Sequence, residues 1–333
     1  MNNKNFLVLG FLGLVFFAIA CGSKTNAAGS AAAISYHDSR EADELSATKD
    51  YGPLIVRPGQ TQAEWTKKPW SSWWYPLNET TLFDTAGNGP STLEKYDTYN
   101  QKAHRNNSTA VDYERKNIYD PQASGWEGLC NAWATASILE SEPSHPITVQ
   151  GITFSVADQK ALLLKSYEQV PGLKVYGQRY DGNPGDDYAD IYPDQFHRVM
   201  VGELFEKGRP FIIDKEAGAP VWNEPVYGVL TTIAVDSHDG GLLHVDTWLS
   251  WADSGDVDPN YVGTRKVNHE YTYDLQANVQ ADGSYKVYNG TWTGDSVHEH
   301  PDFVTIVPDH AVAHSSLNTQ IDSAVVDEIL SRH

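Results

Sequence analysis

The chain begins with a segment that determines the compartment in which the rest must fold. Lys4 precedes an apolar run from Phe6 to Ala20. The run is too short to cross a membrane comfortably, but it has the basic start and the apolar middle of a secretory signal. We therefore predict a signal peptide over residues 1–20 and an exported mature chain.

The apolar run ends in "AIAC", which has the small residues and the cysteine of a bacterial lipobox, although Ala18 stands where leucine is usual. This pattern predicts lipidation of Cys21, and an unlipidated secretion signal is the alternative. Gly22 is not the aspartate that usually retains lipoproteins at the inner membrane, so we expect an outer-membrane or surface lipoprotein of a bacterial cell envelope. Residues 21–55, mostly small and polar, are predicted to be a flexible tether between the lipid and the folded domain.

Lipidation of Cys21 would leave Cys130 as the only thiol, because the chain has two cysteines. No disulfide within the chain is then possible, and an apolar core must supply the stability. Hydrophobic residues make up 40% of the chain, with 10 Trp, 18 Tyr and 10 Phe, which is enough for such a core. The formal charge of −20 disfavours nucleic acid as a partner and suits solubility, cationic groups such as lysine side chains, and divalent metals.

Helical and strand-like patterns are separated along the chain. The first half contains four helical segments: Ser91–Tyr99, "GWEGLCNAWATASILE", a segment capped by Ser155, and "FHRVMVGELFEKG". Six strand-like segments follow: "PFIIDKEAG", "VYGVLTTIAVD", "LLHVDTWLSWA", "VNHEYTYDLQANV", "SYKVYNGTWTG" and "DFVTIVP". This order predicts an α+β fold, with helices first and then a mostly antiparallel sheet. We expect one domain over residues 56–310 and a C-terminal tail with a short helix over residues 311–333.

Cys130 lies early in the second of these helical segments, and that position has a chemical use. A helix N-terminus offers partial positive charge and N–H groups, which lower the pKa of a thiol and can stabilise an oxyanion. A nucleophilic cysteine is therefore one interpretation of Cys130, and a buried, inert cysteine is the other.

A resemblance to a known family favours the nucleophile. The segment "APVWNEPVYGV", Ala219–Val229, resembles the V-W-N-Q-P-V segment of oomycete cell-wall transglutaminases, with Glu224 in place of Gln. Other stretches agree with this transglutaminase elicitor family in the same order: "PWSSWWYP", "LEKYD", "WEGLCNAW", "FIIDKEAG", "YTYDL" and "GTWTGDSVHEHPDF". The chain is identified as a bacterial member of the family, and the resemblance implies a papain-like or transglutaminase-like cysteine acyltransferase core.

The resemblance also implies an activity, protein-glutamine γ-glutamyltransfer, which is usually calcium-dependent. Cys130 would form a thioester with a peptide-bound glutamine, and a lysine or polyamine amine would then take the acyl group. The partners implied are proteins that bear glutamine and lysine. Family members usually have His after the cysteine, where this chain has Asn131. A papain-like protease or a cell-wall amidase would share the first half-reaction, and a surface recognition lipoprotein with a structural cysteine is the alternative that is not an enzyme.

Such a site needs a histidine with an orienting carboxylate. His300, with Asp302 two residues later, lies in a stretch that matches the family, and His197 also matches a family position. His244 is the third candidate, since Asp246 lies on the same face of its predicted strand. For each histidine the alternative is an ordinary packing or surface role.

Five further residues are candidates at the site. Asp214 ends an apolar strand just before the V-W-N-E-P-V hexad of Val221–Val226. There it would orient the histidine or cap a turn. Trp222 and Asn223 invite comparison with the Trp and Asn beside the papain site. We expect both of them, together with Trp126 and Trp133, to contact substrate, and structural roles are the alternative.

Two acidic loops, Asp181–Asp190 and Ala252–Asn260, are candidates for the calcium site that the family implies. Carboxylates at alternate positions can gather around a hard cation. Neither loop has the complete EF-hand spacing, and a solvated loop is the alternative for both. We therefore assign no metal ligands from the sequence.

Overall fold

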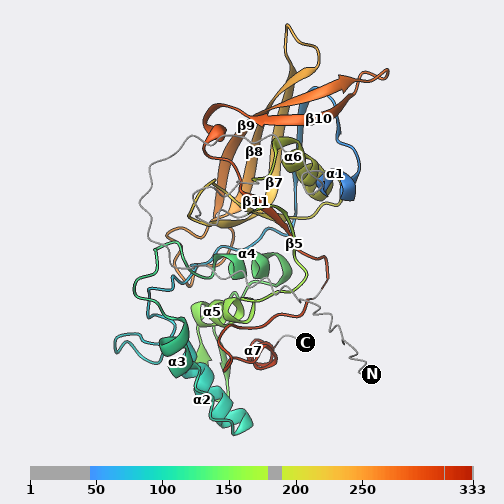
Figure 1. Cartoon of the computed structure of the whole chain (residues 1–333). Coiled ribbons are helices and arrows are strands. Elements are labelled where there is room, and N and C mark those ends of the chain that lie inside the picture. Colours follow the sequence, from blue (N-terminus) through green and yellow to red (C-terminus); the bar gives the residue numbers. More distant parts are fainter. Residues whose placement is uncertain (1–45, 179–189, 311, 332–333) are drawn as a thin grey trace, which may run out of the picture.

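The computed structural model describes residues 46–178, 190–310 and 312–331. Figure 1 shows a sheet-rich half, with α6 and α1 beside the sheet, and a helical half that contains α2, α3, α5 and α7. The helix α4 lies between the two halves. The predicted α+β class is confirmed. The predicted signal peptide, Cys21 and most of the predicted tether lie outside the described residues.

One large sheet dominates the molecule, and every described pair of neighbouring strands in it is antiparallel. The strand order is β1-β10-β9-β8-β7-β6-β11-β5, and β2 also pairs with β7. The three long central strands are β7 (Asn223–Val235), β8 (Leu242–Ala252) and β9 (Lys266–Val279). The others are β1 (Ile55–Val56), β2 (Gly59–Glu64), β5 (Lys174–Gly177), β6 (Phe211–Asp214), β10 (Tyr285–Trp292) and β11 (Phe303–Ile306), and β3 (Ile147–Val149) pairs separately with β4 (Ile152–Phe154).

Two helices of the helical half begin at the caps that the sequence predicts. In α2 (Thr92–His104) the Ser91 hydroxyl accepts from the Glu94 N–H, and the Glu94 carboxylate accepts from the Ser91 N–H. Ser155 and Asp158 form the same box at α5 (Val156–Ser166). The other helices are α1 (Ser46–Tyr51), α3 (Ala110–Tyr113), α4 (Cys130–Leu139), α6 (Pro193–Met200) and α7 (Ser323–Ile329). Short π-helical segments, Glu114–Ile118 and Val201–Glu206, follow α3 and α6, and Gly294–Val297 is a 3₁₀ turn.

Two apolar cores meet at β6. Ile212 belongs to the core of the helical half, whereas Ile213 belongs to the core under the sheet. Successive side chains of a strand point to opposite faces, so β6 is covered on both sides. The junction of α4 with the first residues of β7 lies beside this doubly covered strand.

The packed region extends beyond residues 56–310 at both ends. Ala47 and Leu54 are buried against the sheet core, and Val326 and Ile329 of α7 are buried in the helical core. These apolar side chains stabilise segments that the sequence assigned to a tether and a tail. Within the described ranges, the structure contains no helix with the length and apolar character needed to cross a membrane.

Candidate active site

Cys130 is the first residue of α4, and its side chain is fully buried. The preceding residue, Leu129, has no polar side chain that could cap the helix. Its backbone N–H donates to the carbonyl of Trp74, which holds the loop against the helix start. The thiol therefore lies in the first turn of a helix, where the helix dipole favours its ionised form.

The sulfur of Cys130 contacts the residues just before and at the start of β7. Its thiol lies 3.6 Å from the Val221 carbonyl, to which it donates, and the Asn223 side-chain amide donates to the sulfur over 3.6 Å. Asp214, the last residue of β6, is the direct cross-strand partner of Asn223, and its carboxylate accepts the Trp222 N–H at 2.8 Å. The structure thus brings four predicted site residues, Cys130, Asp214, Trp222 and Asn223, to one junction.

Glu224 is the next residue of β7. In the sequence it differs from the glutamine of the family pattern, and that difference alone predicted no role for it at the site. Its side chain is 2% exposed, and its carboxylate lies 3.6 Å from the ammonium of Lys215. Burial raises the pKa of Glu224 well above its usual range, the charges of Asp253 and Cys130 act in the same direction, and Lys215 opposes them. The carboxyl group and the thiol therefore influence each other's ionisation.

Aromatic rings line one side of the junction. The half-buried ring of Trp222 meets Trp74 edge-on at 5.5 Å, and Trp74 lies 4.0 Å from Trp73. The Lys215 ammonium lies 4.9 Å from the centre of the Trp222 ring. Gly128 makes this arrangement possible, because a Cβ there would lie 2.7 Å from the Trp74 ring.

The two remaining tryptophan candidates have different surroundings. Trp126 is half-buried in the loop before α4. Trp133 is fully buried, and its indole N–H donates to the Trp70 carbonyl at 2.8 Å. Trp133 therefore packs the core of the helical half, and the structure gives it no surface on which a substrate could lie.

A small hollow lies between α4 and the sheet, beside Asn223. Its volume is about 30 Å³, and its lining includes Asn131 and Thr135 of α4 and Thr305 of β11. This space is enough for about one or two water molecules. The residue after the cysteine therefore faces the same hollow as Asn223.

His197 lies elsewhere, in a buried network under the sheet. Its Nδ1 atom is 2.6 Å from the Tyr273 hydroxyl, which bonds to Thr247, and Thr247 bonds to Thr231. Thr231 follows Asn223 by eight positions on β7, a distance of about 26 Å along the strand. Burial lowers the pKa of His197 to about 3, so the ring is neutral at pH 7.

His244 lies on the exposed part of β8, with its side chain 49% exposed. Its ring bonds to Asp274 on β9 at 2.7 Å and to Asp236 at 3.1 Å, so its carboxylate partners are not the predicted Asp246. These bonds, that to Asp274 first, raise the pKa of His244. Its partner on β7 is Ala234, about 36 Å along the strand from Asn223.

His300 is fully buried between three other segments. Its Nδ1 atom lies 2.9 Å from the Ser296 carbonyl, its Nε2 atom lies 3.0 Å from the Asp190 carboxylate, and its ring stacks on Trp292. Asp302 is also fully buried, and its carbonyl accepts the Ile191 N–H. These contacts tie the chain before α6 to the segment that leads into β11.

The expected contact between the cysteine and a histidine is not among the hydrogen bonds of the described residues. Those bonds join Cys130 to Val221 and Asn223, and not to His197, His244 or His300. For two of these histidines the reason is the strand register, since their side chains lie far along the sheet from the start of β7.

The acidic loop Ala252–Asn260 does not fit calcium. The Asp253 carboxylate pairs with the Arg265 guanidinium at 3.2 Å, and the same guanidinium donates to the carbonyls of Gly255 and Asp256. The Arg265 cation therefore already bonds to three of the oxygens that this loop could offer to calcium. Across the parts of the chain that the structure describes, no cluster of three His, Cys, Asp or Glu suits a metal ion, and the loop Asp181–Asp190 lies outside them except for Asp190.

Comparisons with known proteins identify a family for the chain and a similar solved fold. The family described as "Transglutaminase elicitor" matches residues 97–333. The fold is similar to the crystal structure of the GP42 transglutaminase from Phytophthora sojae, with a TM-score of 0.67 and 21% sequence identity over 87% of this chain and 97% of that chain. No curated protein matches the chain. Because the family match covers well over half of the sequence, the protein belongs to the transglutaminase elicitor family.

Proposed function

We propose that the protein is a cysteine acyltransferase of the protein-glutamine γ-glutamyltransferase type, with Cys130 as its nucleophile. One observation carries the proposal: the sulfur lies at the start of α4 and contacts the family hexad at Val221 and Asn223. A merely structural cysteine would not need an amide donor and a helix N-terminus at the same atom.

The first half-reaction begins with the loss of the thiol proton, which points to the Val221 carbonyl. The helix dipole and the N–H of Asn223 then stabilise the thiolate. The thiolate attacks the γ-carbonyl carbon of a peptide-bound glutamine and forms a C–S bond. The C–N bond breaks, the leaving nitrogen takes up the proton that the thiol lost and departs as ammonia, and a thioester remains on Cys130.

In the second half-reaction a lysine or polyamine amine attacks the thioester carbonyl. An amide C–N bond forms, the C–S bond breaks, and the proton that the amine loses returns to the sulfur. Water in place of the amine would give deamidation. The rings of Trp74 and Trp222 support transfer over hydrolysis in this proposal, because they cover one side of the junction and restrict water.

Amine incorporation tests the proposal. The mature protein is incubated with casein and dansylcadaverine, with added calcium or with a chelator. We expect Cys130→Ala and Cys130→Ser to reduce incorporation by on the order of 10³-fold or more, with unchanged circular dichroism. Incorporation by Cys130→Ala at the wild-type rate would contradict the assignment. Casein cleavage or ammonia release without incorporation would identify a hydrolase instead.

We further propose that the mature protein is anchored through Cys21, on the evidence of the apolar run and the "AIAC" sequence. Expression of the full chain in a bacterium with labelled palmitate tests this proposal. The wild-type chain should carry the label and remain with membranes, whereas Cys21→Ser should lose both properties. A labelled Cys21→Ser variant would exclude the assigned site.

A further inference from the structure

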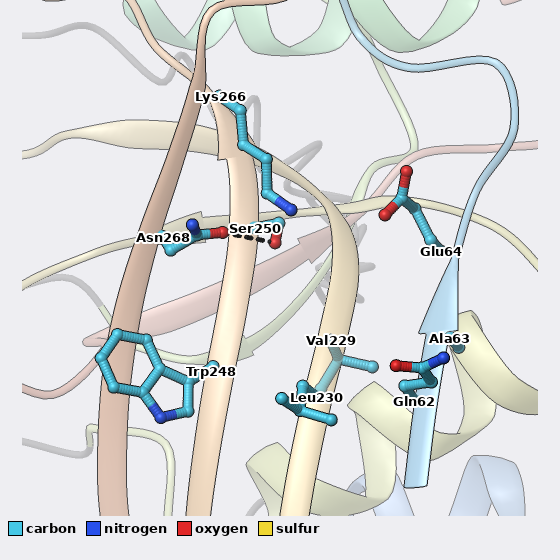
Figure 2. Close-up of a pocket in the computed structure, with 9 residues that line it drawn as sticks. All are labelled: Gln62, Ala63, Glu64, Val229, Leu230, Trp248, Ser250, Lys266 and Asn268. Atoms are coloured by element: carbon cyan, nitrogen blue, oxygen red, sulfur yellow. Dashed lines mark hydrogen bonds between the residues drawn. The ribbon is translucent and has the colours of Figure 1, made fainter.

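An exposed indole lies in a groove on the sheet, away from the cysteine junction. Trp248 of β8 is 44% exposed, although most large rings of this sheet are buried. Figure 2 shows it at one side of the groove, whose volume is about 470 Å³. This volume falls in the range of roughly 300–1,000 Å³ that is common for binding pockets.

The groove crosses the middle of the sheet. Leu230 of β7 pairs with Gln62 of β2 on one side and with Trp248 of β8 on the other. Figure 2 shows Gln62 and Glu64 across the groove from Trp248. The backbone of β7 is therefore already bonded on both sides, so an added peptide strand cannot pair there, and a ligand must be held by side chains.

The charges in the groove compensate one another. Glu64 lies 2.6 Å from Lys68, and this bond, with a further contribution from Lys266, lowers the pKa of the carboxyl group. Lys266 is itself a lining residue whose ammonium points toward the groove in Figure 2. In a chain with a formal charge of −20, this balanced region attracts neither a cation nor an anion strongly.

The remaining polar groups are neutral and both donate and accept. The Asn268 carbonyl oxygen accepts from the Ser250 hydroxyl at 2.8 Å, which leaves the amide N–H groups of Asn268 to point elsewhere. Gln62 across the groove offers a donor and an acceptor. A flat apolar ring bordered by such groups complements a pyranose, which has C–H faces and a rim of hydroxyls.

We propose that this groove is a binding site for a neutral polysaccharide, with Trp248 as the stacking platform. Ser250 and Glu64, which line the groove, both lie next to Gly228, where an added Cβ would lie 3.2 Å from the Ser250 side chain and 3.6 Å from that of Glu64. The site does not involve Cys130, so it provides attachment to a glycan surface independently of the proposed transfer reaction.

Affinity electrophoresis of the mature protein in gels that contain laminarin, soluble cellulose or mannan tests the proposal, with a high-mannose glycoprotein as a second source of neutral sugar. At least one neutral glycan should retard the wild type, equally at low and high salt. Trp248→Ala should weaken this binding by about tenfold or more, and Trp248→Phe should restore part of it. Tyr288→Ala, which removes another exposed ring outside the groove, should bind as the wild type does.

Three results would overturn the proposal: no retardation of the wild type by any neutral glycan, equal binding by Trp248→Ala, or binding that disappears at high salt. Cys130→Ala should be retarded as strongly as the wild type. A failure of amine incorporation would therefore not affect the result on glycan binding. A failure of glycan binding would likewise not affect the proposed transfer reaction.

Discussion

Strand β7 passes two buried polar clusters, one made of neutral groups and one that includes a carboxyl group and a thiol. Near its far end, Thr231, Thr247, Tyr273 and His197 form a chain of bonds between 2.6 and 2.9 Å. At its beginning, the Cys130 sulfur bonds to the Val221 carbonyl and to the Asn223 amide over 3.6 Å, an ordinary length for a hydrogen bond that involves sulfur. One carboxylate oxygen of buried Glu224 has no hydrogen-bond partner among the described residues.

The difference indicates two uses of buried polarity. A buried network of neutral groups stabilises the fold, because its hydrogen bonds compensate for the lost contact with water. At the other cluster, burial and the charges of Asp253 and Cys130 raise the pKa of the Glu224 carboxyl group, and a buried carboxyl group perturbed in this way is typical of sites that carry chemistry. Changes in the first cluster should therefore alter stability, and changes at the Cys130 junction should alter activity.

Among changes to residues around the nucleophile, the largest effect is expected for Asn223→Ala. This change removes the amide that donates to the sulfur, and loss of one such donor costs on the order of 10²-fold in rate. The measurement is the steady-state rate of amine incorporation. Asn131→Ala is the matched control, since it removes an amide from the same hollow that makes no hydrogen bond to the sulfur. Equal losses in the two variants would exclude a specific role for Asn223.

His197→Phe should change stability and leave activity intact. The variant loses the bond to Tyr273, which should lower the free energy of unfolding by about 1–3 kcal/mol in urea titrations at pH 7. The incorporation rate of the folded variant should equal that of the wild type. A variant that is fully stable but inactive would place His197 in the catalytic machinery instead.

The lowered pKa of His197 should also make the stability of the protein depend on pH in the acidic range. Folded His197 stays neutral down to about pH 3, whereas the unfolded ring binds a proton below about pH 6.5. Its contribution is therefore complete above pH 6.5 and is lost as the pH falls toward 3. The melting temperature of the wild type should fall more steeply than that of His197→Phe between pH 6.5 and 4, and parallel curves would contradict this assignment.

A smaller effect is expected for Glu224→Gln. A negative charge on the Glu224 carboxyl group would disfavour a nearby thiolate, so its removal should shift the pH midpoint of Cys130 alkylation by iodoacetamide downward, by less than about one unit. Asp246→Asn, a change of an exposed carboxylate on β8, should leave the midpoint in place. An upward shift for Glu224→Gln would mean that the carboxylate assists ionisation.

The smallest effect is expected for His244→Gln. The folded pKa of His244 is raised, so its pairs with Asp274 and Asp236 stabilise the protein at low pH and lose this contribution as the pH rises through the folded value. Because the side chain is half exposed, the loss should stay below about 1 kcal/mol at pH 5. Amine incorporation should not change, and a tenfold decrease would show that an exposed histidine–aspartate pair does contribute.

Local signals predicted much of the fold. The spacing of Ser91 with Glu94 and of Ser155 with Asp158 correctly gave the starts of two helices, because a capping box depends only on neighbouring residues. The "ADGS" sequence of Ala281–Ser284 is likewise a local signal, typical of a hairpin turn, and the bond from the Gln280 N–H to the Ser284 carbonyl closes the turn between β9 and β10 there. The ends of the packed region were less well predicted, since burial of Ala47 depends on distant segments.

The site was predicted only where its residues are close in sequence or flank one junction. Trp222 and Asn223 lie in the hexad that marks the start of β7, and Asp214 ends the strand beside it. The carboxylates that bond to His244 come from other segments of the chain. On β7, a register shift between Val226 and Gly228 also separates the start of the strand from the residue that pairs with His244. Positions along an antiparallel sheet depend on such pairings, which the local sequence pattern does not reveal.

The central claim is that Cys130 becomes acylated by glutamine, and intact-protein mass spectrometry tests it most directly. The mature protein is incubated briefly with a glutamine peptide in the absence of any amine and quenched in acid. Wild-type protein should gain the mass of the peptide minus ammonia, the adduct should map to Cys130, and added dansylcadaverine should remove it. An adduct that persists on Cys130→Ala, or an unmodified wild type that nevertheless incorporates amine into casein, would contradict the account.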